Sequence, residues 1–193
     1  MRLVVGLGNP GSRYRGTRHN VGFRVLRELC SRWGVDTQRR AFGGTVYEAR
    51  PARSGGPPER VTMLAPETYM NRSGQAVQQM RAFYKAEPAD LLIVLDDYAL
   101  PLGRLRFRAQ GSAGGHNGLA DVLGRLGTDE VPRLRIGIGS PRPGQDAIGF
   151  VLSRFGPEEE PEIEAAVRQA AQAVEDWTFE GITPVMNRYN ASP

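Results

Sequence analysis

Leu91-Leu92-Ile93-Val94-Leu95 is the most apolar run of the chain, and it is followed at once by Asp96 and Asp97. A short, uninterrupted run of large aliphatic residues is typical of a strand that is buried on both faces, in the middle of a sheet. In α/β proteins, ligands bind at the carboxyl ends of such strands. We therefore expect a central strand here, with the two acids at a functional edge of the sheet.

Strand-like and helix-like segments alternate on both sides of this run. The other strand-like segments are Leu3 to Leu7, Thr45 to Ala49, Arg60 to Leu64, Arg104 to Arg108 and Arg133 to Ile138. The helix-like segments are Val21 to Trp33, Ser73 to Tyr84 with Ser73 as N-cap, a short helix from Leu119, and Glu158 to about Trp177. This alternation predicts an α/β sheet covered by helices on both faces.

Length and composition are those of one globular domain that covers residues 1–193. Of the 193 residues 40% are hydrophobic, which is enough for a substantial core. No run approaches the ~18 to 20 apolar residues that a membrane helix needs, and Met1 and Arg2 lead directly into Leu3 to Leu7 without a secretion signal. We expect a soluble, cytoplasmic protein that does not bind a membrane.

Few residues could form a metal site or a disulfide. Cys30 is the single cysteine, so an internal disulfide is impossible. Together with the only two histidines, His19 and His116, it is too small a ligand set for structural zinc. Cys30 lies in the first helix-like segment, where we expect it to be a small core residue.

Basic residues outnumber acidic ones, 25 to 21, which gives a net charge of +4, and Lys85 is the only lysine. Arg104, Arg106 and Arg108 alternate in a strand-like segment, which would place all three guanidinium groups on one face. Such a row can bind phosphates, because arginine presents a planar, permanently charged fork. It can equally be a solvated sheet face, and the composition favours neither interpretation.

The two histidines are candidates for a general base, because both lie in glycine-rich loops and histidine accepts protons near neutral pH. An acid that fixes the tautomer of such a histidine would assist it, and Asp96 and Asp97 are available. The sequence does not pair either acid with either histidine. The two segments read Thr17-Arg18-His19-Asn20-Val21-Gly22 and Gly114-Gly115-His116-Asn117-Gly118-Leu119.

Signatures of a covalent nucleophile are missing. None of the serines lies in a Gly-x-Ser-x-Gly motif, and Cys30 is distant in sequence from both histidines. Water is therefore the expected attacking group. Its reaction would need hydrogen-bond donors for a developing oxyanion. Asn9, Asn71 and Asn117 are at loop positions after candidate strands and could supply them.

A glycine-rich stretch after the first strand imitates a dinucleotide-binding motif. Gly6-Leu7-Gly8-Asn9-Pro10-Gly11 matches Gly-x-Gly-x-x-Gly, in which the last glycine opens a helix. Here the following residues form a polar loop, and the helix-like pattern begins only near Val21. Nicotinamide binding is not expected, and a Walker-type phosphate loop is excluded because Lys85 lies in Phe83-Tyr84-Lys85.

Taken together, these segments resemble the successive motifs of the bacterial peptidyl-tRNA hydrolase family, in the family's order and over nearly the whole chain. The resemblance implies a single α/β domain with a twisted, mixed and largely parallel sheet, acting as a monomer without metal or cofactor. The motifs are Val5-Gly6-Leu7-Gly8-Asn9-Pro10-Gly11, Tyr14, Thr17-Arg18-His19-Asn20, Tyr69-Met70-Asn71-Arg72-Ser73-Gly74, Asp96-Asp97, Gly114-Gly115-His116-Asn117-Gly118-Leu119 and Arg133-Leu134-Arg135-Ile136-Gly137-Ile138-Gly139.

The resemblance also implies a reaction, the hydrolysis of the ester that joins a peptide to the 3′-terminal ribose of tRNA, which recycles tRNA from prematurely released peptidyl-tRNA. His19 matches the family's general base and Asp96 the acid that keeps it basic. Asn9 matches the residue that helps to distinguish a blocked substrate from a free aminoacyl one.

Other matching positions imply a binding groove for the tRNA 3′ end and the peptide. Tyr14, Tyr69, Asn71 and Asn117 match residues that line this groove, and Met70 and His116 fall in the same motifs. Arg108 and Arg135 fall where the family has basic residues that bind tRNA phosphates.

The chain departs from the family's pattern at two positions. Ala99 stands where a second carboxylate is common, which affects the expected hydrogen bonding near Asp96. Ser140 stands before Pro141 where some relatives have histidine, and we interpret this change as peripheral.

Two other classes of function are compatible with parts of the sequence. Plant organelles use proteins of this fold as non-catalytic intron splicing factors, but the presence of His19, Asp96 and the three asparagines favours an enzyme. A nucleotide-dependent oxidoreductase would rest on the glycine-rich stretch alone.

Overall fold

The computed structural model describes residues 1–53 and 55–191, and within them seven strands form one sheet in the order β2-β3-β4-β1-β5-β7-β6. The strands are β1 (Arg2–Gly6), β2 (Arg39–Ala41), β3 (Gly44–Ala49), β4 (Val61–Pro66), β5 (Leu91–Asp97), β6 (Leu105–Arg108) and β7 (Arg133–Gly137). The four central strands pair in parallel, and the pairings outside them are antiparallel. The predicted mixed sheet with β5 in its interior is confirmed.

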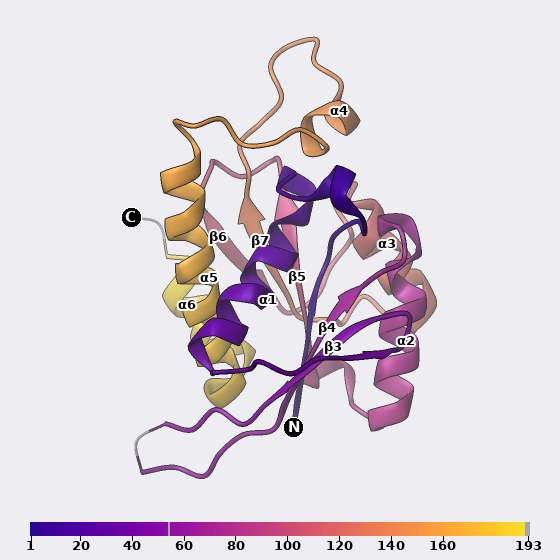
Figure 1. Cartoon of the computed structure of the whole chain (residues 1–193), viewed down its shortest axis with the longest axis vertical. Helices are drawn as coiled ribbons and strands as arrows, with labels where there is room; N and C mark the ends of the chain where they lie inside the picture. The colour runs from indigo at the N-terminus through magenta and orange to yellow at the C-terminus, as the bar shows by residue number, and fades with distance from the viewer. Residues whose placement is uncertain (54, 192–193) are drawn as a thin grey trace.

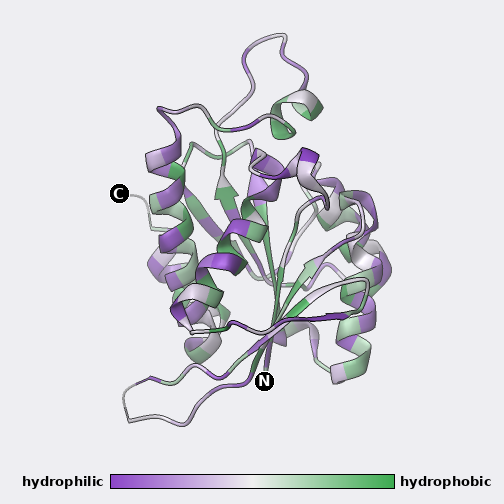
Figure 2. Ribbon diagram, viewed as in Figure 1, coloured by the Kyte–Doolittle hydropathy of each residue, from purple (hydrophilic) through white to green (hydrophobic). Residues whose placement is uncertain are grey.

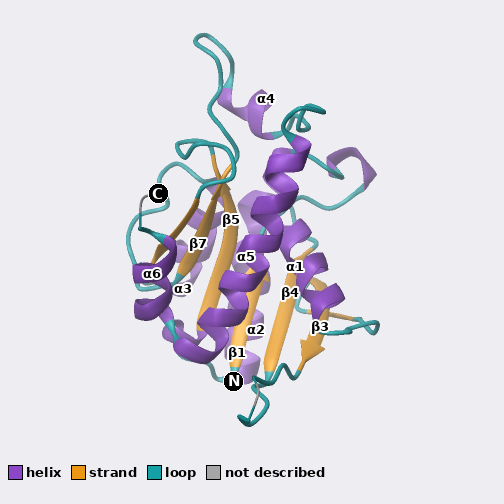
Figure 3. Cartoon of the chain, turned by 90° about the vertical axis from the view of Figure 1, so that its left-hand side faces the viewer, coloured by secondary structure: helices purple, strands orange, loops and turns teal. Residues whose placement is uncertain are grey.

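Helices cover both faces of the sheet (Figures 1 and 3). The helices are α1 (Val21–Arg32), α2 (Ser73–Tyr84), α3 (Asn117–Leu126), α4 (Ala147–Val151), α5 (Glu160–Glu180) and α6 (Ile182–Tyr189), with short 3₁₀ turns η1 (Ser12–Tyr14), η2 (Arg18–Asn20), η3 (Met70–Arg72) and η4 (Pro88–Asp90). Helices α1, α5 and α6 pack on one face, and α2 and α3 on the other. Among the described residues, no helix has the length and apolar character needed to cross a membrane.

The alternation of side chains along β5 explains why the fold has two cores. Leu92 and Val94 pack with α1 and α5, whereas Leu91, Ile93 and Leu95 pack with α2 and α3. All five are fully buried, and the central strands form a hydrophobic band in Figure 2. The uninterrupted aliphatic run is therefore the sequence signature of a strand covered on both faces.

Some elements differ from the predicted ones. Asp96 and Asp97 belong to β5 and do not follow it, because they continue its pairing with β7. Ser73 is not an N-cap: it is the first residue of α2, and its hydroxyl donates to the carbonyl of Met70 at 2.8 Å. The elements absent from the prediction are β2, α4 and α6.

The partly buried Cys30 packs against the core on the α1 face, as predicted. Burial raises the pKa of its thiol to about 11. The thiol therefore stays protonated at neutral pH, which suits a structural role.

Gly22 lets the start of α1 approach the sheet closely. A Cβ atom at this position would lie 2.6 Å from the backbone nitrogen and oxygen of Leu7 and from the backbone oxygen of Val94. We predict that Gly22→Ala lowers the free energy of unfolding by about 1–3 kcal/mol, as expected for overpacking against rigid backbone. Chemical denaturation measures this change.

Gly124 provides the matched control for that substitution. It is an exposed position inside α3, and a Cβ there would meet nothing within 4 Å. Gly124→Ala should stabilise the protein by up to about 1 kcal/mol, because alanine is the better helix former. Equal effects of the two substitutions would contradict the proposed close approach.

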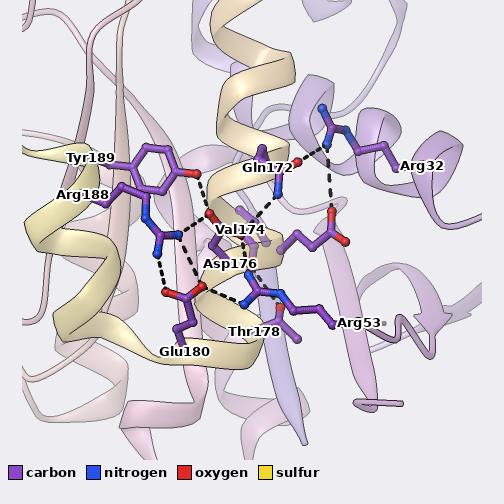
Figure 4. Close-up of polar contacts among 10 residues, drawn as sticks. Arg32, Arg53, Gln172, Val174, Asp176, Thr178, Glu180, Arg188 and Tyr189 are labelled. Carbon is purple, nitrogen blue, oxygen red and sulfur yellow. Dashed lines mark hydrogen bonds and ion pairs between the residues drawn. The ribbon is translucent and has the colours of Figure 1, made fainter. Parts of the chain in front are cut away.

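A polar network attaches the segment between β3 and β4 to the C-terminal helices (Figure 4). Asp176 on α5 accepts hydrogen bonds from Arg53 at 2.6 Å, from Arg188 at 2.7 Å and from the hydroxyl of Tyr189 at 2.7 Å. Glu180 also accepts hydrogen bonds from Arg53 and Arg188. Burial and the neighbouring Asp176 raise the pKa of Tyr189 to about 12. Arg53 is thus tied to α5.

Candidate active site

The carboxyl ends of the parallel strands meet at one edge of the sheet and surround a cavity of about 670 Å³. Asn9 follows β1, Met70 follows β4, and Asp96 is near the end of β5. His116 comes from the loop before α3, and His19 from η2 at the start of α1. The topology therefore gathers side chains that are up to 107 positions apart, since the group runs from residue 9 to residue 116.

Asp96 lies between the two histidines. Nδ1 of His19 is 2.8 Å from Oδ1 and 2.9 Å from Oδ2 of Asp96, and Nε2 of His116 is 3.0 Å from Oδ1. All three side chains are buried. The pairing that the sequence left open is thus settled for Asp96, which contacts both histidines.

The hydrogen-bond partners fix the protons on both imidazoles. Nδ1 of His116 accepts the backbone N–H of Leu119 at 3.1 Å, so the ring proton lies on Nε2 and is donated to Asp96. His19 faces the same carboxylate with Nδ1, and it must donate from that atom. Nε2 of His19 therefore keeps its lone pair, which is the form that a general base requires.

Asp96 is held in its ionised form by its surroundings. Burial opposes the charge, but the attraction of His116 and hydrogen bonds from both histidines outweigh it and hold the pKa of Asp96 well below its ordinary value. A carboxylate of this kind can accept hydrogen bonds from two imidazoles throughout the neutral range. It can also stabilise an imidazolium formed next to it.

This depressed pKa predicts a pH dependence of stability. A carboxyl with a lower pKa in the folded state stabilises the fold above its unfolded pKa of about 3.9, and the contribution is lost as the pH falls toward the folded value. We expect the stability advantage of the wild type over Asp96→Asn to be larger at about pH 5 than at about pH 3. Urea denaturation at both values measures it, and an advantage that grew toward pH 3 would contradict the assignment.

Asn9 is fixed on three sides. Its backbone N–H donates to Oδ1 of Asn20 at 2.8 Å, and its carbonyl accepts from Nδ2 of Asn20 at 3.0 Å. Its own Oδ1 accepts the backbone N–H of Met70 at 2.8 Å. The amide Nδ2 of Asn9 is left as a donor at the wall of the cavity.

Arg18 anchors the loop of His19 to the chain around α4. Its guanidinium forms two bonds to Glu159, donates to the carbonyl of Ile138 at 2.9 Å, and lies 4.5 Å and 4.7 Å from the ring centres of Phe150 and Phe155. Burial of an arginine is tolerated here because its charge is paired. The chain from β7 to α5, which carries one wall of the cavity, is thereby tied to the histidine loop.

Asp97 has a different partner from Asp96. Its Oδ2 is 3.1 Å from Nε of Arg135, and its Oδ1 accepts the backbone N–H of Ala99 at 2.9 Å. Asp97 therefore orients Arg135 at the cavity wall. It also holds the turn at Ala99, the position where a second carboxylate is common in the family. Among the described residues, only Asp96 of the two acids contacts a histidine.

One group of potential metal ligands exists in residues 1–53 and 55–191, and it is the same triad. The ligand atoms of His19, Asp96 and His116 lie within 4.8 Å of one another. These atoms are already joined by hydrogen bonds between the side chains. The arrangement therefore fits a carboxylate that orients two imidazoles better than it fits a set of ligands available to a metal ion.

Comparison with known proteins shows the family of the chain. Residues 3–193 match the family model described as peptidyl-tRNA hydrolase. The chain belongs to the peptidyl-tRNA hydrolase family. The peptidyl-tRNA hydrolase of Symbiobacterium thermophilum is 50% identical over 189 residues, which are 98% of both chains, and that of Chloroflexus aggregans is 50% identical over 192 residues, which cover 98% of this chain and 99% of the other.

A solved structure extends the likeness to the fold. The crystal structure of peptidyl-tRNA hydrolase from Acinetobacter baumannii is 36% identical, with a TM-score of 0.88, and the match covers 99% of this chain and 95% of that chain. The resemblance inferred from the motifs is thereby confirmed, as is the single α/β fold.

The structure brings most of the residues suggested by the peptidyl-tRNA hydrolase motifs to the cavity. The cavity is lined by Asn9, His19, Tyr69, Met70, Asn71, Asp96, His116, Asn117 and Arg135. Two predicted residues do not line it. Tyr14 lies beside it, with its ring in edge-to-face contact with Tyr69 at 6.5 Å, and Arg108 is exposed at the far end of β6, beside a different hollow.

Other residues of the site escaped the sequence analysis. Asn20 and Arg18 are inside the quoted histidine motif, and both are buried in the structure, but the sequence carries no signal for their partners. Ile148, Val151 and Leu152 form an apolar wall from the α4 segment. That segment has no residue typical of catalysis, so the sequence alone could not predict that it lines the cavity.

Proposed function

We propose that this chain hydrolyses the ester between a peptide, or an N-blocked amino acid, and the 3′-terminal ribose of tRNA, with His19 as general base. Membership of the peptidyl-tRNA hydrolase family supports the reaction. The observation that carries the mechanism is the hydrogen bond from Nδ1 of His19 to ionised Asp96, because it leaves Nε2 free to take a proton.

The reaction follows from these protonation states. Nε2 of His19 removes a proton from water while the water oxygen bonds to the ester carbonyl carbon. The resulting imidazolium is stabilised by Asp96, as in other histidine–carboxylate pairs. The tetrahedral intermediate then expels the ribose oxygen, which takes the proton from His19. A free peptide carboxylate and a tRNA with an intact 3′ hydroxyl are the products.

Asparagines at the cavity wall supply donors for the developing charge and for the peptide backbone. The backbone N–H of Met70 donates to Oδ1 of Asn9 and so fixes the orientation of the amide. Nδ2 of Asn9 is then available as a donor to the substrate. Asn71 and Asn117 are exposed at the same cavity. Fixed donors of this kind are effective because they need no reorganisation during the reaction.

The substitution Asn9→Asp tests the role of the Nδ2 donor separately from that of Oδ1. The new side chain keeps an oxygen for the N–H of Met70 but replaces the amide donor with an anion. We expect kcat/KM for an N-acetylated aminoacyl-tRNA to fall roughly 10²- to 10³-fold, the usual loss for one oxyanion donor. Initial rates of release of the labelled amino acid measure it, and a change below about threefold would remove Asn9 from the proposed machinery.

Binding of tRNA is assigned to residues around the rim. Tyr69 is 59% exposed, and with Tyr14 it offers an aromatic wall to the groove that holds the tRNA 3′ end and the peptide backbone. Arg135, oriented by Asp97 at the cavity wall, and Arg108, exposed outside the cavity at the other end of the sheet, are assigned to phosphates of the tRNA. Met70 and His116 shape the cavity between these groups and the base.

A histidine base activated by a carboxylate requires no metal ion or organic cofactor. We extend the proposal accordingly to a metal-independent enzyme that acts as a monomer in the cytoplasm, where its tRNA substrate is found.

The proposed function is tested with a blocked and a free substrate. Purified protein should release N-acetylated amino acid from its tRNA and leave the same unblocked aminoacyl-tRNA nearly intact. If both esters were cleaved equally, the chain would be a general aminoacyl esterase. If neither were cleaved although tRNA bound, it would be a non-catalytic RNA-binding relative.

A further inference from the structure

A second cavity, of about 350 Å³, adjoins the catalytic one on the other side of Asn9, which lines both. Its lining includes residues of α1, β3 and β4, among them Phe23, Tyr47 and Ala65. Three arginines, Arg15, Arg27 and Arg40, line it as well. None of the roles assigned above uses this cavity.

The lining of this second cavity has an uncompensated positive charge. Arg40 pairs with Glu67, which lines the same cavity. Within residues 1–53 and 55–191, neither Arg15 nor Arg27 has a carboxylate within ion-pair distance. Burial and the neighbouring cations Arg24 and Arg15 lower the pKa of Arg27. An anionic group would therefore be attracted to Arg15 and Arg27.

The sheet order places the second cavity opposite the proposed RNA side. β3 and β4 lie on one side of β1, and β5, β7 and β6 lie on the other. Arg135 on β7 and Arg108 on β6, to which tRNA phosphates are assigned, belong to that other side. An ester held between Asn9 and His19 would have its RNA arm toward β7 and its peptide arm toward β3 and β4.

We propose that the second cavity is a peptide subsite that favours acidic side chains in the residues preceding the ester-linked amino acid. The inference rests on the function proposed above. The peptide backbone would pass Asn9, which lines both cavities, in an extended form, and we assign the third and fourth residues before the ester to the second cavity. There an aspartate or glutamate meets Arg15 and Arg27 while its methylene groups contact the apolar residues of the lining.

The test compares three peptidyl-tRNAs that differ only in the third and fourth residues before the ester: both glutamate, both glutamine or both lysine. We expect kcat/KM to decrease in that order, with a ratio of glutamate to lysine of roughly three- to tenfold at low salt, typical of a few exposed ion pairs. In the Arg15→Glu/Arg27→Glu variant the order should invert, and in Arg15→Gln/Arg27→Gln the ratio should approach one.

The ratio within one enzyme is the readout, because it does not depend on the overall activity or on the fraction of folded protein. Arg125→Glu/Arg168→Glu is the matched control: both arginines are exposed on α3 and α5, and the change in net charge is the same. This control should keep the wild-type ratio.

The outcomes separate this inference from the proposed function. A wild type that cleaves N-acetylated aminoacyl-tRNA but shows a ratio of one for the longer substrates would overturn the subsite and leave the hydrolase intact. If the charge-reversal variant lost the same factor with all three peptides, Arg15 and Arg27 would bind RNA and not peptide. Failure to cleave any substrate would instead remove the proposed function.

Discussion

His19→Ala should reduce kcat for an N-acetylated aminoacyl-tRNA by about 10²- to 10⁴-fold, the range that a general base contributes. The loss follows from the structure because Nε2 of His19 is the basic atom that Asp96 leaves free at the cavity. Binding of tRNA should change little, since His19 is buried and no phosphate contact is assigned to it. Single-turnover hydrolysis gives the rate, and filter binding of deacylated tRNA gives the affinity.

Arg108→Ala is the appropriate comparison for this variant. Arg108 is exposed and distant from the base, so its loss should weaken binding without lowering the single-turnover rate at saturating enzyme. A His19→Ala protein that retained more than about a tenth of the wild-type rate would show that another group activates the water.

Asp96→Asn should lower kcat by a comparable factor, on the order of 10²- to 10⁴-fold but no more than His19→Ala. The tautomer of His116 is fixed by the N–H of Leu119, so His116 would donate to the amide oxygen of the new residue. The amide NH₂ would then take the place of Oδ2, 2.9 Å from Nδ1 of His19, where it favours the tautomer with the ring proton on Nε2. The base would be blocked while the cavity kept its shape.

Two variants check that interpretation. Asp97→Asn changes the neighbouring carboxylate, which contacts Arg135 and no histidine, and it should affect KM more than kcat. The double variant His19→Ala/Asp96→Asn should be no slower than His19→Ala alone, because the two residues act as a unit. Multiplicative losses in the double variant would mean that Asp96 acts independently of His19.

The sequence was sufficient for the features that depend on local pattern. The aliphatic run Leu91 to Leu95 identified an interior strand, since a strand covered on both faces has no polar side. The motifs around His19 and His116 identified both imidazoles of the site. The polar loop after Gly11 argued against a dinucleotide motif, and in the structure this loop forms η1 while α1 begins only at Val21.

Features that depend on tertiary contacts could not be predicted. The choice of Asp96 over Asp97 is made by the pleat of β5, which directs successive side chains to opposite faces. The roles of Arg18 and Asn20 come from partners that are distant in sequence, such as Glu159 for Arg18. β2, with three residues, and α4, with five, are too short to give a periodic signal.

The most direct measurement is a single-turnover assay with excess purified protein and an N-acetylated aminoacyl-tRNA, run in chelator with the wild type and His19→Ala side by side. Release of the acetylated amino acid by the wild type, undiminished by the chelator and lost in the variant, is the predicted result. If the wild type bound the tRNA and released nothing, or if His19→Ala were as fast as the wild type, the assignment of His19 as the base of a peptidyl-tRNA hydrolase would be contradicted.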